Sequence, residues 1–201
     1  MQTLLIAVAA YLLGSVSFAV VVSKAMGLPD PHSYGSKNPG ATNVLRTGNK
    51  VAAALTLIGD TGKGALAVVL AAMYTGSDPA IGYDAPIAGA MALLGHLYPV
   101  FHGFQGGKGV ATAAGVFAVL APVALITASA VFVLAVWITR YISIGSIAGA
   151  AALAIVAATG EHPLSVTLGA VIAAVLIVLR HRDNLARLKA GTERRIGLRG
   201  V

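Results

Sequence analysis

Six long apolar runs dominate this chain and restrict what it can fold into. Hydrophobic residues make up 57% of the 201 positions and charged residues only 10%, and the mean hydropathy is +0.84. A helix needs about 20 apolar residues to cross the hydrocarbon of a bilayer. The sequence therefore predicts an all-α integral membrane protein, with a single transmembrane domain over residues 1–201. The runs cover roughly Leu4–Ser23, Val51–Tyr74, Ala85–Phe101, Val110–Thr139, Ile142–Thr159 and Pro163–Leu179.

The fourth run, Val110–Thr139, is long enough for more than one helix and contains Pro122. If it crossed once, Arg140 and the basic tail Arg180–Arg199 would lie outside the cell. A break at Pro122 instead places every lysine and arginine outside the second run on one side of the membrane. This is the cytoplasmic side according to the positive-inside rule. We therefore predict seven transmembrane helices, with the N-terminus outside and the C-terminus cytoplasmic.

The break leaves Val110–Ala121 as a helix of only about 18 Å, too short to cross the membrane. We predict that it is a half-span that enters from the cytoplasmic face. Half-helices whose ends point at a ligand are one way in which membrane proteins build binding sites.

A glycine-rich turn, Gly103-Phe104-Gln105-Gly106-Gly107-Lys108-Gly109, opens this short helix. Glycines let backbone N–H groups close around an anion, and a helix N-terminus adds unpaired N–H groups and a positive dipole end. With the charge of Lys108, the turn is typical of phosphate binding. It is not a Walker A loop, because His102 stands where the first glycine belongs and Gly109 replaces the Ser or Thr. The alternative is a plain interhelical turn.

The loop Pro29–Lys50 is too polar for a mere connection. It combines neutral donors with the cations Lys37, Arg46 and Lys50. Hydroxyls, amides and a guanidinium suit an oxyanion such as phosphate. The alternative is a solvated loop whose cations meet anionic lipid. The neutral donors favour ligand binding, and the candidates are Ser36, Asn38, Thr42 and Asn43.

The basic tail that starts at Arg180 is predicted to continue the last helix. His181 and Asn184 lie three residues apart and would then share one helical face at the membrane boundary. Attraction to lipid headgroups explains most of the remaining tail charge.

Few polar residues lie within the apolar runs, and each needs a reason. Asp60 and Lys63 are three residues apart, and we interpret them as a structural ion pair. His96 is either a hydrogen-bonded packing residue or part of a site near the glycine turn. Ser146 follows Arg140, where a hydroxyl is often only a helix cap. We expect no metal site, and the absence of cysteine excludes thiolate ligands. The remaining histidines His32 and His162 lie in no pattern that predicts a role.

Five motifs, in order along the chain, resemble the bacterial acyl-phosphate:glycerol-3-phosphate acyltransferases of the PlsY type. The resemblance covers essentially the whole chain. No histidine here has an aspartate five residues on, the motif of the larger acyltransferases, which this family also lacks. The motifs are Gly14-Ser15, Gly35–Val44, Gly95–Phe101, Gly106–Thr112 and His181–Asn184.

The resemblance implies a seven-helix enzyme of the bacterial inner membrane with its active site on the cytoplasmic side. It implies transfer of a fatty acyl group from acyl phosphate to the 1-hydroxyl of glycerol 3-phosphate, giving lysophosphatidic acid without a cofactor. It also implies that Arg46, Lys108 and His181 bind phosphate and that the backbone of Gly106, Gly107 and Gly109 cradles the acyl phosphate. Orientation of the substrates would fall to Ser36, Asn38, Thr42, Asn43, His96, Ser146 and Asn184.

Two other classes remain open from the residues alone. A transporter of a phosphorylated solute also suits seven helices, a half-span and polar loops. However, a carrier usually has its site near the midplane and an internal repeat, and we find no repeat. A structural lipid-binding protein would leave the neutral polar residues unexplained.

Overall fold

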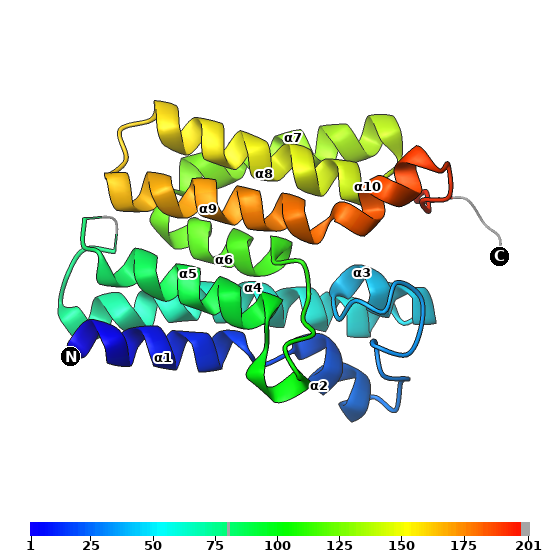
Figure 1. Cartoon of the computed structure of the whole chain (residues 1–201), viewed down its shortest axis with the longest axis horizontal. Helices are drawn as coiled ribbons and strands as arrows, with labels where there is room; N and C mark the ends of the chain where they lie inside the picture. Colours follow the sequence, from blue (N-terminus) through cyan, green and yellow to red (C-terminus); the bar gives the residue numbers. More distant parts are fainter. Residues whose placement is uncertain (80, 198–201) are drawn as a thin grey trace. The chain divides into compact units, whose positions relative to one another are not determined.

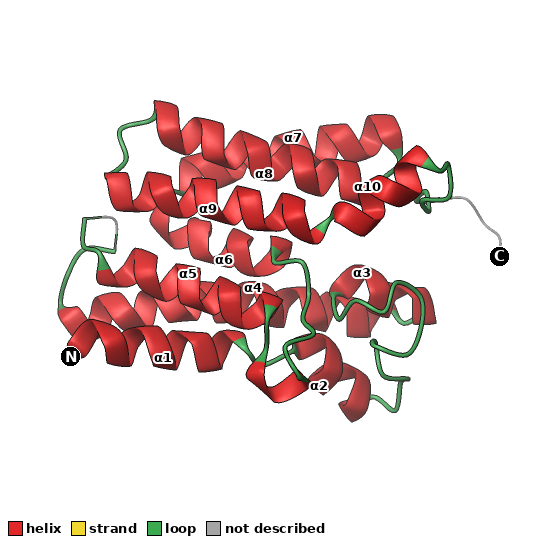
Figure 2. Cartoon of the chain, viewed as in Figure 1, coloured by secondary structure: helices red, strands yellow, loops and turns green. Residues whose placement is uncertain are grey.

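The computed structural model describes residues 1–79 and 81–197, and these ranges contain helices and loops but no strand (Figures 1 and 2). This confirms the predicted all-α class. The α-helices are α1 (Gln2–Gly14), α2 (Phe18–Ala25), α3 (Ala41–Val44), α4 (Lys50–Thr75), α5 (Asp84–Leu97), α6 (Val110–Leu120), α7 (Pro122–Thr139), α8 (Ile142–Thr159), α9 (Leu164–Arg180) and α10 (Arg182–Lys189). Two single 3-10 turns, η1 (Leu45–Thr47) and η2 (Val100–His102), lie in the polar loops.

The chain divides into two compact units, the first ending at Leu120 and the second starting at Ala121. In the first unit α1 packs against α5, and α4 packs against α5 and α6, while α2 and α3 cover the start of α4. The connection between α5 and α6 lies at the same end of this unit as the loop between α2 and α3 (Figure 1). The two predicted phosphate-binding segments are therefore neighbours.

Glycines allow the helices of the first unit to approach closely. A Cβ on Gly64 of α4 would overlap the Thr112 carbonyl of α6, and one on Gly115 of α6 would overlap the Thr61 carbonyl. Small residues at such crossings let backbones meet, which is the usual packing device of membrane helices. This packing fixes where α6 begins, and hence where the glycine turn must end.

The second unit is built from α7, α8 and α9, with α8 packed against both neighbours. Gly145 and Gly149 of α8 face Phe132 of α7, and their lack of side chains lets the two helices pack closely. The α7–α8 connection, α10 and the tail up to residue 197 meet at one end of this unit, where the Ile196 amide donates to the Arg140 carbonyl at 2.8 Å (Figure 1).

The predicted break in the fourth run is confirmed. Helix α6 ends at Leu120 and α7 starts at Pro122, with Ala121 between them at φ −152° and ψ 68°. Proline has no N–H to continue a helix and pushes the preceding residue out of the helical region.

Within the described residues, three helices, α4, α7 and α8, are long and apolar enough to span a membrane, and the number rises to five if each bent pair forms one span. The bent pairs are α1–α2, with a bend of 41°, and α9–α10, with a bend of 49°. Helix α5, with 14 residues, and α6, with 11 residues, are shorter.

The tail does not continue the last helix straight, so that prediction was wrong. The chain bends at His181, which ends α9 and precedes α10. The His181 ring explains the break locally, because its Nδ1 lies 2.7 Å from the Ile177 carbonyl and competes with the backbone for that acceptor.

Candidate functional site

The glycine turn is folded back onto the end of α5. The Gly107 amide donates to the His96 carbonyl at 3.0 Å, and the Phe104 amide donates to the Pro99 carbonyl at 2.9 Å. Gly106, Gly107 and Gly109 are buried and Lys108 is half-buried. Gly109 has φ +85°, a conformation that favours glycine, and α6 starts directly after it. The turn thus delivers Lys108 to the N-terminus of α6.

Two of these glycines leave no room for a side chain. A Cβ on Gly106 would overlap the His96 carbonyl, and one on Gly107 would overlap the His96 Nε2. The same Cβ of Gly107 would lie 3.0 Å from the Pro39 carbonyl, which belongs to the first polar loop. The two predicted phosphate-binding segments therefore touch, and His96 lies under their junction, as its proximity in sequence suggested.

Asn43 holds the first polar loop together. Its Oδ1 accepts from the Ser36 amide at 3.0 Å and lies 3.2 Å from the Ser36 hydroxyl. Its Nδ2 donates to the carbonyls of Pro31 at 2.9 Å and Tyr34 at 3.2 Å. Asn43 is buried, so these bonds assign it a part in shaping the loop that presents Ser36.

Arg46 lies on η1, next to this loop, and is exposed. Its Nη1 would lie 3.0 Å from a Cβ on Gly35, so the guanidinium packs along the backbone of the Gly35–Val44 motif. Thr42 is also exposed, on α3, and Asn38 is half-buried. The cations Arg46 and Lys108 therefore stand on two segments of one unit that are in contact with each other.

A buried ion pair lies beneath this junction. Lys63 Nζ is 2.9 Å from Asp60 Oδ1, with both side chains at most 3% exposed, as predicted for a structural pair. Lys63 Nζ also donates to the Val16 carbonyl at 2.6 Å, at the break between α1 and α2. His96 Nδ1 lies 3.6 Å from the same Asp60 oxygen. The pair thus connects the α1–α2 break to the histidine that supports the glycine turn.

The remaining predicted residues lie in the second unit. His181 and Asn184 are buried there, and Asn184 Nδ2 donates to Glu193 at 2.5 Å. Glu193 also accepts from the Ser143 hydroxyl at 3.0 Å and from Arg187 Nε at 2.7 Å. Burial by itself raises the pKa of Glu193, but these three donors outweigh it and lower the pKa overall. Ser146 donates to the Ile142 carbonyl of its own helix at 2.9 Å and does not cap α8, which begins after Tyr141.

Two residues that hold the polar segments in place were not predicted from the sequence. Glu193 is the first, since an acid in a basic tail gave no sign that it joins three polar side chains. The second is His32, which links the two loops of the first unit. Its partner Asp30 has a lowered pKa, chiefly because the His32 amide donates to the carboxylate. Each has one partner from far away in the sequence, Ser143 for Glu193 and Gln105 for His32.

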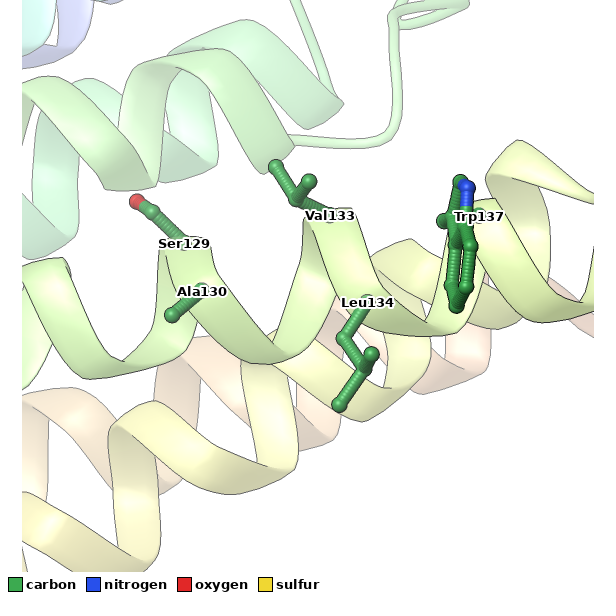
Figure 3. Close-up of a pocket in the computed structure, with 5 residues that line it drawn as sticks. All are labelled: Ser129, Ala130, Val133, Leu134 and Trp137. Carbon is green, nitrogen blue, oxygen red and sulfur yellow. The ribbon is translucent and has the colours of Figure 1, made fainter.

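A shallow apolar hollow of about 490 Å³ lies on α7 and is lined by Ser129, Ala130, Val133, Leu134 and Trp137 (Figure 3). None of these side chains is ionisable. Helix α7 is long enough to span the membrane and is mostly exposed in the structure. The surface suits contact with lipid chains and not with a phosphate.

Helices of membrane-spanning length and a glycine turn with one lysine, packed on a loop rich in neutral donors, define an integral membrane protein equipped to bind oxyanions. A family model described as glycerol-3-phosphate acyltransferase matches residues 4–191. The chain belongs to the glycerol-3-phosphate acyltransferase family.

Relatives and solved structures agree with this assignment. A glycerol-3-phosphate acyltransferase of Cupriavidus taiwanensis is 54% identical over 205 residues, covering 98% of each chain. One of Burkholderia pseudomallei is 52% identical over 199 residues, covering 98% of this chain and 97% of the relative. The crystal structure of PlsY (YgiH), an integral membrane glycerol 3-phosphate acyltransferase, in its glycerol 3-phosphate form has a TM-score of 0.90 and 36% identity, covering 98% of this chain and 96% of that chain. Its lysophosphatidic acid form has a TM-score of 0.89 with the same identity and coverage.

Proposed function

We propose that this chain transfers a fatty acyl group from acyl phosphate to the 1-hydroxyl of glycerol 3-phosphate, giving lysophosphatidic acid. This is the first step of phospholipid synthesis. Membership of the family supports the acceptor and the product class. The cations and neutral hydrogen-bond donors of the two polar segments support acyl phosphate as the acyl donor. Both substrates then carry a phosphate group that these side chains can bind.

The observation that carries the proposal is the contact between the glycine turn and the first polar loop. The turn carries Lys108, and the loop carries Ser36 and Arg46. A charge-assisted hydrogen bond to phosphate is about twice as strong as a neutral one. Two anions held side by side by such groups need little further help to react, because alignment supplies much of the rate.

The roles of individual residues follow from the family motifs. We propose that Lys108, Arg46 and His181 bind phosphate and stabilise charge in the transition state. The backbone of Gly106, Gly107 and Gly109 is proposed to cradle the acyl phosphate. Asn43 acts through the shape of its loop. The proposed substrate-orienting residues are Ser36, Asn38, Thr42, His96, Ser146 and Asn184.

The proposed reaction is a direct displacement without cofactor. The glycerol 1-oxygen attacks the acyl carbonyl, the ester C–O bond forms, and the bond between the acyl carbon and the phosphate oxygen breaks. Inorganic phosphate leaves with the electron pair. A phosphate oxygen of a substrate accepts the proton of the hydroxyl, because no carboxylate of the motifs is placed to do so. His96 and His181 are the alternative bases.

We also propose that residues 1–201 work as one catalytic domain with seven transmembrane helices in the bacterial inner membrane, and that one of these helices, α6, is a half-span. The polar loops and the tail would face the cytoplasm, where the positive-inside rule puts their lysines and arginines. Accessibility tags test this. A tag in the Pro29–Lys50 loop and one in the tail should react only from the cytoplasm, and one at Asp78 only from outside. A tail exposed to the outside would refute the arrangement.

The activity is tested with purified protein in detergent, palmitoyl phosphate and radiolabelled glycerol 3-phosphate. We expect lysophosphatidic acid and inorganic phosphate in equal amounts, with no product when palmitoyl-CoA replaces palmitoyl phosphate. Because detergent micelles enclose no compartment, a transporter would give no product. Product from palmitoyl-CoA alone would refute the proposed donor.

A further inference from the structure

Both ring nitrogens of His32 face oxygen acceptors. Nδ1 lies 2.8 Å from Asp30 Oδ1, and Nε2 lies 3.1 Å from the Gln105 carbonyl. The His32 amide also donates to Asp30 Oδ1 at 2.8 Å, which fixes the carboxylate beside the ring. His32 thus joins the loop between α2 and α3 to the glycine turn, 73 residues further along the chain.

This geometry selects one protonation state of the ring. A neutral imidazole carries a single N–H, so it can donate to only one of the two oxygens and turns a lone pair toward the other. The imidazolium donates to both. The contacts around His32 are therefore complete only when the ring is protonated.

The acceptor Gln105 directly precedes Gly106, Gly107 and Lys108. On the inner side, the turn is held by the hydrogen bond from the Gly107 amide to the His96 carbonyl. On the outer side it is held by His32. Releasing the outer contact removes one hold on the segment that carries Lys108, while the backbone bonds from Gln105 to His102 and from Gly107 to His96 stay in place.

The other titratable groups around His32 are consistent with a charged ring. Asp30 and Tyr34 lie on its own loop, and the His102 ring on η2 is 5.9 Å away, centre to centre. Burial, and then the charge of a protonated His32, lower the pKa of His102 against the opposing effect of Asp30, which favours the neutral form of His102. Asp30 is lowered in pKa and remains the counter-charge. The pKa of Tyr34 is raised by burial and by Asp30, so the phenol stays neutral.

We propose that protonated His32 is a positioning residue that clasps the glycine turn to the first polar loop and makes phosphate-substrate binding depend on pH. The kinetic side of this proposal rests on the proposed acyltransferase function. The clasp is closed while the ring carries a proton on both nitrogens and opens when one proton is lost. Opening leaves the chemistry intact but lets Lys108 move, so KM should rise with little change in kcat.

Three variants test the clasp by their steady-state kinetics at pH 6 and pH 8. His32→Ala removes it, and KM for a phosphate substrate should be several-fold above wild type at pH 6 and close to wild type at pH 8. His32→Arg keeps a positive charge and hydrogen-bond donors at both pH values. Its KM should therefore lack the rise between pH 6 and pH 8 that opening of the clasp causes in the wild type. His162→Gln is the matched control, a histidine on the α8–α9 connection, and should follow the wild-type profile. A wild-type KM for His32→Ala at both pH values would overturn the proposal.

Hydrogen–deuterium exchange of the peptide containing Gln105–Gly109 provides a readout that needs no catalysis. At pH 6, exchange in His32→Ala should exceed that in His162→Gln, and at pH 8 the two should agree. Comparing variants at one pH removes the intrinsic pH dependence of exchange. If this difference appears while no variant makes product, the acyltransferase proposal fails and the clasp stands. If product forms but exchange is equal at pH 6, the clasp is wrong.

Discussion

Gly107 contacts His96 in two ways, through a backbone hydrogen bond and through close packing on the His96 ring. Its amide donates to the His96 carbonyl at 3.0 Å, and a Cβ in its place would overlap the Nε2 of the same histidine. The glycine turn therefore has one way to lie on the end of α5, and the bulk of any other residue is excluded on that side.

Replacing Gly107 by alanine should therefore displace the turn. We expect kcat/KM to fall at least about tenfold, since small misplacements of binding groups have effects of this size or larger. The control is Gly62→Ala on α4, where a Cβ meets nothing within 4 Å. That change should leave activity unchanged and raise stability by up to about 1 kcal/mol. Initial rates and thermal unfolding in detergent measure both, and equal activity of the two variants would contradict the steric argument.

Removing Arg46 or Lys108 should weaken activity without unfolding the protein. A charge-assisted hydrogen bond contributes about 1.5–3 kcal/mol, so Arg46→Ala and Lys108→Ala should each lower kcat/KM by roughly 10- to 150-fold. Lys189→Ala, at the exposed end of α10, is the matched control and should have little effect. If all three variants lose activity alike, the cations act through general membrane electrostatics and not at a site.

Breaking the Asp60–Lys63 pair should destabilise the first unit. Lys63→Met leaves Asp60 charged and buried without its partner, a change that costs about 3–5 kcal/mol in comparable cases. The double variant Asp60→Asn with Lys63→Met should recover part of this loss, because the uncompensated charge is gone. Thermal unfolding of the single and double variants measures the coupling free energy between the two side chains. A double variant less stable than Lys63→Met alone would contradict the pairing.

Glu193 should stabilise the second unit in a pH-dependent way. Its folded-state pKa is lowered below 4.5, so its contribution is complete above pH 4.5 and is lost as the pH falls through the folded pKa. Glu193→Gln should cost about 1–3 kcal/mol near pH 7, and the difference from wild type should shrink in acid. Unfolding curves at pH 7, 5 and 3.5 measure this. A difference that grows on acidification would have the wrong sign for this site.

If a substrate phosphate takes the proton, neither buried histidine of the motifs is indispensable. His96→Gln and His181→Gln should then slow turnover without abolishing it, and both should keep the wild-type pH profile of kcat. Loss of His181 should appear largely in KM for one substrate. Abolition of turnover at saturating substrate, restored by added imidazole, would identify that histidine as the base.

The elements that were predictable from sequence are those set by local physics. The length of α8 follows from an uninterrupted apolar run, and the end of α6 follows from the missing N–H of Pro122. The ion pair of Asp60 with Lys63 follows from helical spacing and the cost of burying a single charge. The glycine turn was recognisable because several glycines and one lysine directly precede an apolar helix.

The tertiary structure decided which distant groups meet. Ser36 and Asn43 show why. From the sequence, both are candidate hydrogen-bond donors to a ligand, but only the folded loop shows that the Asn43 amide group bonds to the backbone of Ser36 and Pro31. The bend at His181 likewise depends on the ring reaching back to Ile177. His32 and Glu193 gave no sequence signal, because a single residue acquires a role only from partners that long-range packing brings to it. Local patterns thus determined the membrane class, the helices and the glycine turn, while the three-dimensional packing determined which distant side chains contact one another and hold the two polar segments in shape.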